Sequence, residues 1–395
     1  MFLSLFLIFG LGVLGGYIFE KIRLPRLVWY LIIGILFGPS LLNIIDQDLL
    51  QISSYLRQIA LVIILTRSGL SLDIKTLKEI GRPAIFMCFI PACFEIIGVV
   101  IFGPLFLKIS YVEALLLGSV LAAVSPAVVI PRMIKIKEAG FGSTNHVPEL
   151  IMAGASCDDI FVIVLFYGFK GLVASSSFNA ILFLQIPLSI ILGLLLGILV
   201  GIVLFLIFKY FKINTIGKTI LMLAASFGMI ALEQALKQYV SISSLLGIIV
   251  LGILILKKNK EAAKEIQNNY NALWNAFEIL LFALVGCAVD MHYAFSKDGG
   301  ILLGVIALSL CFRAVGVFIC LIATKYSIKE KVFILLSYLP KATVQASIGG
   351  IALSEGLECG KIIITAAVLS ILITAPIGAI LMDYTYPKLL EKSLL

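Results

Sequence analysis

Long apolar stretches separated by short polar loops fill almost the whole chain. A helix that crosses a bilayer needs about 17–25 predominantly apolar residues. Stretches close to that length can be placed thirteen times in the 395 residues. Their approximate limits are 2–19, 27–45, 55–72, 83–107, 112–132, 147–169, 179–208, 216–235, 241–256, 273–292, 300–323, 331–354 and 361–382. The pattern predicts an all-α polytopic membrane protein with about thirteen transmembrane helices.

Composition supports this fold class. The chain is 61% hydrophobic and only 13% charged, whereas soluble domains carry about 25% charged residues. The first span lacks a basic leader region and a small-residue cleavage site, so we expect it to stay in the protein. No Gly-rich phosphate loop precedes a lysine, so nothing points to ATP. We therefore predict a transporter rather than an enzyme, with no cofactor.

The net charge of +8 reflects topology rather than nucleic-acid binding. Basic residues gather in alternate loops, and positive loops face the cytoplasm. The clusters are Lys21, Arg23 and Arg26; Lys75, Lys78 and Arg82; Arg132, Lys135 and Lys137; Lys209, Lys212 and Lys218; Lys257, Lys258, Lys260 and Lys264; Lys325, Lys329 and Lys331; and Lys388 and Lys392. This alternation predicts a multi-pass protein of the cell membrane with its N-terminus outside and its C-terminus in the cytoplasm.

The cysteines show no metal-site or disulfide spacing. They fall mostly inside predicted spans, and none forms a CxxC pair. They are Cys88, Cys93, Cys157, Cys287, Cys311, Cys320 and Cys359. We interpret them as small apolar residues, with neither a disulfide framework nor a zinc site.

Thirteen spans divide into six, one linker and six, which makes the second half inverted relative to the first. Inverted repeats are frequent in transporters, where discontinuous helices form a site at the midplane. Pro126 and Pro131 lie in the fifth span of the first half, and Pro340 lies in the fifth span of the second. Since proline removes a backbone donor and clashes with the preceding turn, each is a candidate break. We predict two inverted six-helix repeats, joined by a linker helix, with two broken helices crossing in the core.

Two adjacent acids, Asp158 and Asp159, lie inside the apolar run 150–169. A charge near the bilayer centre costs about 2.5 to more than 10 kcal/mol, so its default interpretation is functional. A purely structural ion pair would need only one acid. Neighbouring residues on a helix point about 100° apart, so the two acids cannot share one ligand position. We predict that Asp159 is the main cation ligand and that Asp158 faces another partner.

A broken helix beside the doublet can supply further oxygen ligands. The Ser125 hydroxyl and the carbonyls freed at the break suit a small hard cation. A proton and a sodium ion then compete for the same oxygen atoms. Exchange follows if the site faces each side of the membrane in turn.

Other charges inside or beside predicted spans have two interpretations each. Arg313 stays charged in proteins, and it either forms a structural pair with Glu95 or takes a direct part in transport. Lys341, at the second break, either offsets helix-end carbonyls or takes part in the site. Glu278 is either solvated near the cytoplasmic end of its span or attracts cations into a funnel.

The segments that carry these residues resemble the cation:proton antiporter superfamily, in particular the NHA branch of sodium/proton antiporters. The matching segments are 24–40, 67–73, 125–131, 154–159, 277–286 and 339–346. The Ser125-Pro126 break and the Asp158-Asp159 doublet are the most specific of these features. The Glu95 and Arg313 combination is similar to that branch.

The resemblance implies exchange of sodium or lithium for protons, with Asp159 as the essential ion-binding acid and Asp158 before it. It implies an elevator-type motion of a core at about 82–170 and 300–385. It also implies a homodimeric scaffold at about 1–80 and 213–295, and we expect the linker helix at about 179–211.

Two other functions stay open on the sequence. One is potassium/proton exchange within the same superfamily, and the other is a passive cation channel or a sensor. An intramembrane aspartyl protease fits badly, because it needs two aspartates on separate helices and this doublet lies on one.

Overall fold

The computed structural model describes residues 1–72, 80–142, 144–174, 180–236, 240 and 242–392. Within them the regular secondary structure is helical, and the only β contact is one isolated bridge between Phe141 and Lys392. Asp73 of the matching segment, residue 179 of the predicted linker and residue 241 of the ninth predicted span lie outside the described residues.

The chain forms two compact units. Unit 1 comprises Met1–Ser54, Asp73–Phe169 and Ile279–Leu395, and unit 2 comprises Tyr55–Leu72 and Lys170–Glu278. The helices of unit 1 are α1 (Phe2–Lys21), α2 (Arg26–Phe37), α3 (Gln47–Gln51), α6 (Arg82–Met87), α7 (Ile90–Phe102), the π-helix η1 (Gly103–Leu107), α8 (Tyr111–Leu121), α9 (Pro126–Glu138), most of α10 (Val147–Ala174), α15 (Met291–Ala294), α16 (Lys297–Cys320), α17 (Ile328–Ser337), α18 (Thr343–Ile348), α19 (Ile351–Ser354) and α20 (Gly360–Leu389). Those of unit 2 are α4 (Ser53–Ser71), α11 (Ala180–Tyr210), α12 (Thr215–Leu236), α13 (Ser244–Lys258) and most of α14 (Lys260–Cys287).

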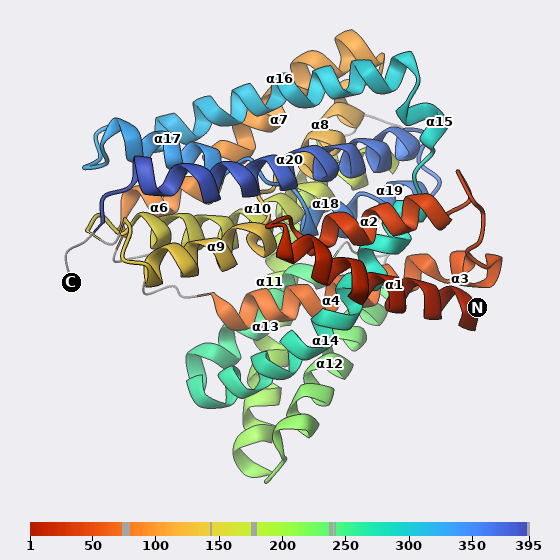
Figure 1. The fold of residues 1–395 in the computed structure, drawn as a ribbon. Coiled ribbons are helices and arrows are strands. Elements are labelled where there is room, and N and C mark those ends of the chain that lie inside the picture. Colours follow the sequence, from red (N-terminus) through yellow and green to blue (C-terminus); the bar gives the residue numbers. More distant parts are fainter. Residues whose placement is uncertain (73–79, 143, 175–179, 237–239, 241, 393–395) are drawn as a thin grey trace. The chain divides into compact units, whose positions relative to one another are not determined.

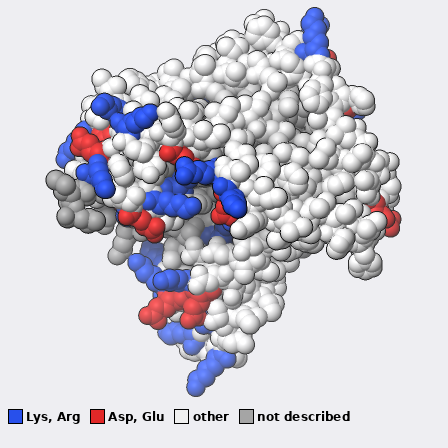
Figure 2. Space-filling model, viewed as in Figure 1, with Lys and Arg blue, Asp and Glu red and all other residues white. Residues whose placement is uncertain are grey.

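The apolar stretches of the sequence form membrane-length helices. In the described part of the chain, nine helical segments are long and apolar enough to cross a bilayer. They are Phe2–Lys21, Arg82–Leu107, Tyr111–Glu138, Val147–Val173, Leu188–Tyr210, Thr215–Leu236, Lys260–Cys287, Lys297–Cys320 and Gly360–Leu389. Figure 2 shows charged side chains confined to small patches, while most of the visible surface belongs to other residues. The chain is a multi-pass membrane protein.

Three of the predicted spans are interrupted inside unit 1. Helix α8 ends at Leu121 and α9 begins at Pro126, as the proline at the start of α9 predicts. Helix α17 ends at Ser337 and α18 begins at Thr343, with Pro340 between them. A third interruption, not predicted, separates α6 from α7.

Pro131 was also a candidate break, but it lies inside α9 and does not end it. Proline in a membrane helix removes one hydrogen bond, and neighbouring groups can compensate for that loss. Helix α20 likewise continues through two prolines. A proline alone therefore does not end a helix in this protein, because α9 and α20 continue through theirs.

Within unit 1, α7 and α16 lie side by side (Figure 1). Two glycines permit this close contact. A Cβ atom added at Gly98 would lie 3.1 Å from Ser309 Cα, and one at Gly316 would lie 2.9 Å from Pro91 Cα. The contact matters for function because α7 carries Glu95 and α16 carries Arg313.

Unit 2 is held by similar close contacts. Helix α11 packs against α13, and α13 approaches α4 where Gly252 meets Gly69. Arg67 of α4 lies over the Trp274 ring of α14, 5.2 Å from its centroid. Small residues at such crossings allow membrane helices to pack closely.

Replacing Gly316 by Ala should destabilise the protein. The new methyl group would meet Pro91 Cα at 2.9 Å and Phe94 Cβ at 3.0 Å, and overpacking of this kind costs about 1–3 kcal/mol. We expect a lower melting temperature in detergent. The matched control is Gly304→Ala on the same helix, where nothing lies within 4 Å and Ala favours the helix by about 1 kcal/mol. Equal melting temperatures for both variants would contradict the close α7–α16 contact.

Candidate ion-binding site

The two interrupted spans of unit 1 that contain Ser125 and Pro340 meet at their breaks. The Ser125 amide donates to the Pro340 carbonyl at 2.8 Å. The Gln345 side chain links the two breaks again, because its Nε2 donates to Ala123 O at 2.8 Å and to Leu121 O at 3.3 Å. Its Oε1 accepts the amide of Ala342 at 2.9 Å, which caps the start of α18. One glutamine side chain thus forms hydrogen bonds with backbone groups at the end of α8 and at the start of α18.

Arg313 of α16 reaches this crossing and donates to four oxygen atoms. Its Nε donates to Tyr338 O at 2.9 Å, and its Nη2 donates to Asp158 Oδ2 at 2.9 Å. Its Nη1 donates to Glu95 Oε2 at 2.9 Å and also to the Ala122 carbonyl. The arginine is only 1% exposed. The guanidinium therefore joins α7, α10 and both breaks through its planar fork of donors.

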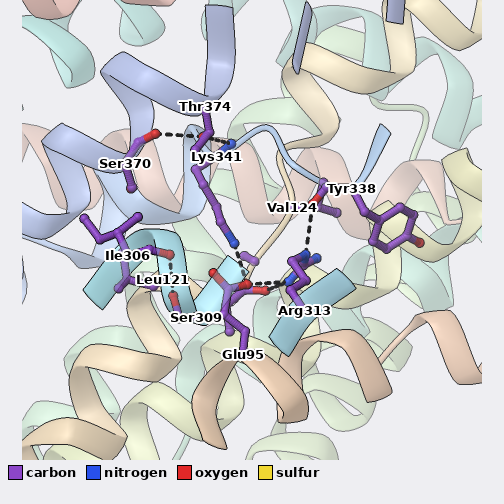
Figure 3. A network of polar contacts seen from close by, with 12 residues as sticks. Glu95, Leu121, Val124, Ile306, Ser309, Arg313, Tyr338, Lys341, Ser370 and Thr374 are labelled. Carbon is purple, nitrogen blue, oxygen red and sulfur yellow. Dashed lines mark hydrogen bonds and ion pairs between the residues drawn. The ribbon is translucent and has the colours of Figure 1, made fainter. Parts of the chain in front are cut away.

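Lys341 approaches Glu95 from the second break. Its Nζ donates to the same Oε2 atom at 2.6 Å, and its amide donates to Thr374 Oγ1 at 2.9 Å. Figure 3 shows Lys341 and Arg313 reaching Glu95 from separate elements. With Asp158 included, the network contains two acids and two bases. The charges balance inside the protein, which is how buried charges are retained.

Asp158 and Asp159 occupy different surroundings, as their positions on one helix predict. Asp158 is fully buried, and its Oδ2 accepts the Val124 amide at 2.8 Å as well as Arg313. Asp159 is 7% exposed and does not share this position. Asp158 is therefore held by Arg313 and by the backbone just after the end of α8. These are the partners of Asp158 that the sequence could not name.

Several buried oxygen atoms near the breaks have no hydrogen-bond partner in the part of the chain that is described. They include Ser125 Oγ, Thr343 Oγ1 and Asp158 Oδ1. A buried polar atom left unpaired costs about 1–3 kcal/mol, so each such atom in a native protein needs an explanation. Hydroxyl and carboxylate oxygens are ligands for hard cations. These three atoms have the right chemistry to hold a small monovalent cation, and the start of each broken half-helix supplies one of them.

The structure brings together most of the residues that the sequence singled out. Glu95, Arg313, Lys341 and Asp158 form one network, and Ser125 lies at the crossing. Arg313 contacts both Glu95 and Asp158, so the pair with Glu95 is present, while a direct part in transport stays a prediction. The Lys341 ammonium contacts Glu95. The carbonyls freed at the end of α8 accept hydrogen bonds from Arg313 and Gln345 instead.

Glu278 belongs to a different compact unit from these residues. It lies on α14 in unit 2 and is half-buried. Its two interpretations, a solvated residue or part of a cation funnel, both stay predictions.

Sequence reasoning missed three contributors to the site. Gln345 and Thr343 both fall in the matching segment 339–346, but nothing in their spacing assigned them a role. Tyr338 contributes a backbone carbonyl, and no side-chain pattern can reveal such a partner. A search for polar residues just after a proline break would have found the first two.

The transmembrane model of the sodium/hydrogen exchanger family matches residues 6–383. The chain belongs to the sodium/hydrogen exchanger family. The resemblance to the cation:proton antiporter superfamily is therefore confirmed.

Relatives of this exchanger cover nearly its whole length. Sodium/hydrogen exchanger 9B1 of Homo sapiens is 34% identical over 408 residues, which span 98% of this chain and 78% of the relative. Sodium/hydrogen exchanger 9B2 of Mus musculus is 30% identical, over 99% of this chain and 74% of the relative. The sodium proton antiporter MjNhaP1 from Methanocaldococcus jannaschii has a similar fold, with a TM-score of 0.82 at 22% identity, over 98% of this chain and 97% of that structure.

Arg313→Ala should strongly lower the thermal stability of this exchanger. Removing one member of a buried ion pair costs about 3–5 kcal/mol, because the partner is left buried and uncompensated. Arg313→Lys should fall between this variant and the wild type, since an ammonium cannot reproduce the planar fork. The measurement is the melting temperature in detergent.

The matched control is Arg26→Ala, which removes an exposed pair with Glu20 at 3.5 Å and should have little effect. A normal melting temperature for Arg313→Ala, together with lost cation binding, would favour a direct role in transport instead.

Proposed function

We propose that this exchanger is a secondary active antiporter that exchanges sodium or lithium for protons at Asp158 and Asp159. The observation that carries the proposal is the position of the doublet, with Asp158 bonded to the break between α8 and α9. Three buried oxygen atoms, on Ser125, Thr343 and Asp158, accompany it and have no hydrogen-bond partner among the described residues. The names of the relatives support sodium and protons as the exchanged ions.

In this proposal the two acids have different tasks. Asp159 binds the cation and gives up or takes up the proton, because both ligands compete for its carboxylate oxygens. Asp158 contributes its Oδ1, while Arg313 and the Val124 amide hold its Oδ2 in place. Ser125 and Thr343 complete the oxygen shell. Glu95 and Lys341 keep the surrounding charges balanced as the cation and the proton alternate.

The proposed architecture has thirteen spans in two inverted six-helix repeats. Each of the thirteen predicted spans overlaps one or more of the described helices, including the short α2 and α13. The fifth spans of the two proposed halves are both interrupted, and their breaks bond to each other. Inverted repeats with broken helices at the midplane are typical of alternating-access transporters.

The same proposal includes an elevator-type motion, in which a core at about 82–170 and 300–385 moves against a scaffold at about 1–80 and 213–295. It also includes a homodimer in the cell membrane. The alternation of basic loops supports an outside N-terminus and a cytoplasmic C-terminus.

Asp159→Asn should abolish exchange. Asparagine keeps the size and one oxygen ligand of the side chain, but it cannot carry the exchanged proton. In proteoliposomes, addition of sodium or lithium should release protons from the wild type and not from the variant. Asp298→Asn changes an exposed acid in the first turn of α16 and should exchange normally. Full exchange by Asp159→Asn would refute the proposed site. If the wild type releases protons only on addition of potassium, the exchanged cation is potassium and not sodium or lithium.

Ser125→Ala should weaken cation binding while leaving exchange possible. The lost hydroxyl is one oxygen ligand among several, and interactions of this size contribute about 0.5–1.5 kcal/mol. We expect the apparent KM for sodium to rise about two- to tenfold, with the maximal rate less affected. Ser119→Ala is the matched control, because its buried hydroxyl already donates to Leu116 O at 2.7 Å. An unchanged KM in Ser125→Ala would remove Ser125 from the proposed shell.

A further inference from the structure

The unpredicted junction between α6 and α7 runs along α10 beside the acidic doublet. The junction consists of Cys88 and Phe89. The Phe89 ring lies 6.0 Å from the Phe161 ring of α10, measured between centroids. A Cβ atom added at Gly154 of α10 would lie 3.0 Å from Met87 Cβ. The junction therefore packs along about two turns of α10, on either side of the doublet.

At this contact two cysteine side chains meet. Gly154, Cys157 and Phe161 lie on one face of α10, and the two residues that flank Cys88, Met87 and Phe89, pack against Gly154 and Phe161. Cys88 therefore lies opposite Cys157, and its thiol donates to Ala84 O at 3.1 Å. Both cysteines are free, and both are half-buried rather than sealed in the core. The sequence spacing predicted no cysteine pair, and it is the interruption of the α6–α7 span that places Cys88 against α10. Neither thiol has a task in the proposed exchange.

Cys157 directly precedes Asp158, so a change at the thiol pair acts on the doublet. A disulfide requires a sulfur–sulfur distance of about 2.03–2.05 Å, which is shorter than the separation of two thiols that are not covalently bonded. Forming it pulls α10 and the junction together. Asp158 is held by directional hydrogen bonds from Val124 and Arg313. A misplacement of about 1 Å in a positioned group can cost roughly a hundredfold in rate.

We propose that Cys88 and Cys157 form a reversible redox modification site, and that their disulfide slows cation exchange by displacing the acidic doublet. The oxidant is a hydroperoxide such as hydrogen peroxide, which is small and uncharged and therefore suits a half-buried pair. Both thiols are free in the structure, so their disulfide is a reversible modification and not a structural crosslink of the fold.

The chemistry balances in two steps. The thiolate of one cysteine attacks a peroxide oxygen, so that an S–O bond forms, the O–O bond breaks, and the leaving hydroxide takes the released thiol proton to give water. The sulfur of the second cysteine then attacks the sulfenic acid. An S–S bond forms, the S–O bond breaks, and the departing hydroxide takes the second thiol proton. Two thiols lose two electrons and two protons, and one peroxide becomes two waters. A small dithiol reverses the modification by thiol–disulfide exchange.

One other thiol competes for Cys88. Cys320, at the end of α16, also lies near Cys88, but it is only 1% exposed. Cys311 on the same helix is exposed and provides a matched control. The effect on exchange rests on the proposed function, whereas formation of the disulfide does not.

The test uses the full chain in proteoliposomes, treated with hydrogen peroxide and then with dithiothreitol. Peptide mass spectrometry should identify a Cys88–Cys157 disulfide. Sodium-dependent proton release should fall at least fivefold and return after dithiothreitol. Cys88→Ser and Cys157→Ser should each exchange at a rate that peroxide leaves unchanged, and Cys311→Ser should respond like the wild type.

A disulfide between Cys88 and Cys320, or no disulfide at Cys88, overturns the proposal. So does an equal loss of exchange in Cys88→Ser and the wild type, or a Cys88–Cys157 disulfide that leaves the rate unchanged. If the disulfide forms reversibly but the untreated protein exchanges no cation, the proposed function fails and the modification site stands.

Discussion

A permanently charged guanidinium inside a membrane-spanning bundle is the constraint on which the site depends. Arg313 cannot lose its proton in a protein, and it is almost completely buried. Its donors must therefore find acceptors within the fold, and they find them on α7, α10 and the two helix breaks. The same requirement brings the helices that carry these acceptors to one point. The close contact between α7 and α16 at their glycines is part of the same solution.

The helix breaks have a second consequence. Each break frees backbone groups that need partners in the absence of water, and Gln345 and Arg313 supply several of them. Within the described part of the chain, several buried oxygens of these elements still have no hydrogen-bond partner, among them those of Ser125, Thr343 and Asp158. A rigid frame that satisfies the backbone but leaves side-chain oxygens available is well suited to a transported cation.

The sequence predicted those features that depend on local composition. Apolar length predicted membrane helices, Pro126 and Pro340 predicted the two breaks, and the cost of buried charge pointed to the Asp158-Asp159 doublet. It could not predict the contact between Lys341 and Glu95, because that contact depends on how two distant elements cross. The role of Gln345 depends on the backbone conformation of a different helix, and the meeting of Cys88 with Cys157 depends on the unpredicted break in the α6–α7 span. Pro131 is an error in the other direction, because the sequence predicted a break there and the helix continues through it.

If one protein couples proton movement to cation movement, a proton gradient drives sodium or lithium against its own gradient, and this uphill transport can be measured. Wild-type proteoliposomes can be given equal sodium or lithium inside and outside, together with a proton gradient. The account predicts that the cation then moves against its own developing gradient, that the movement saturates with cation concentration, and that it stops when a protonophore collapses the proton gradient. Movement of the cation only down its own gradient, unaffected by the proton gradient, would contradict coupled exchange and indicate a passive channel.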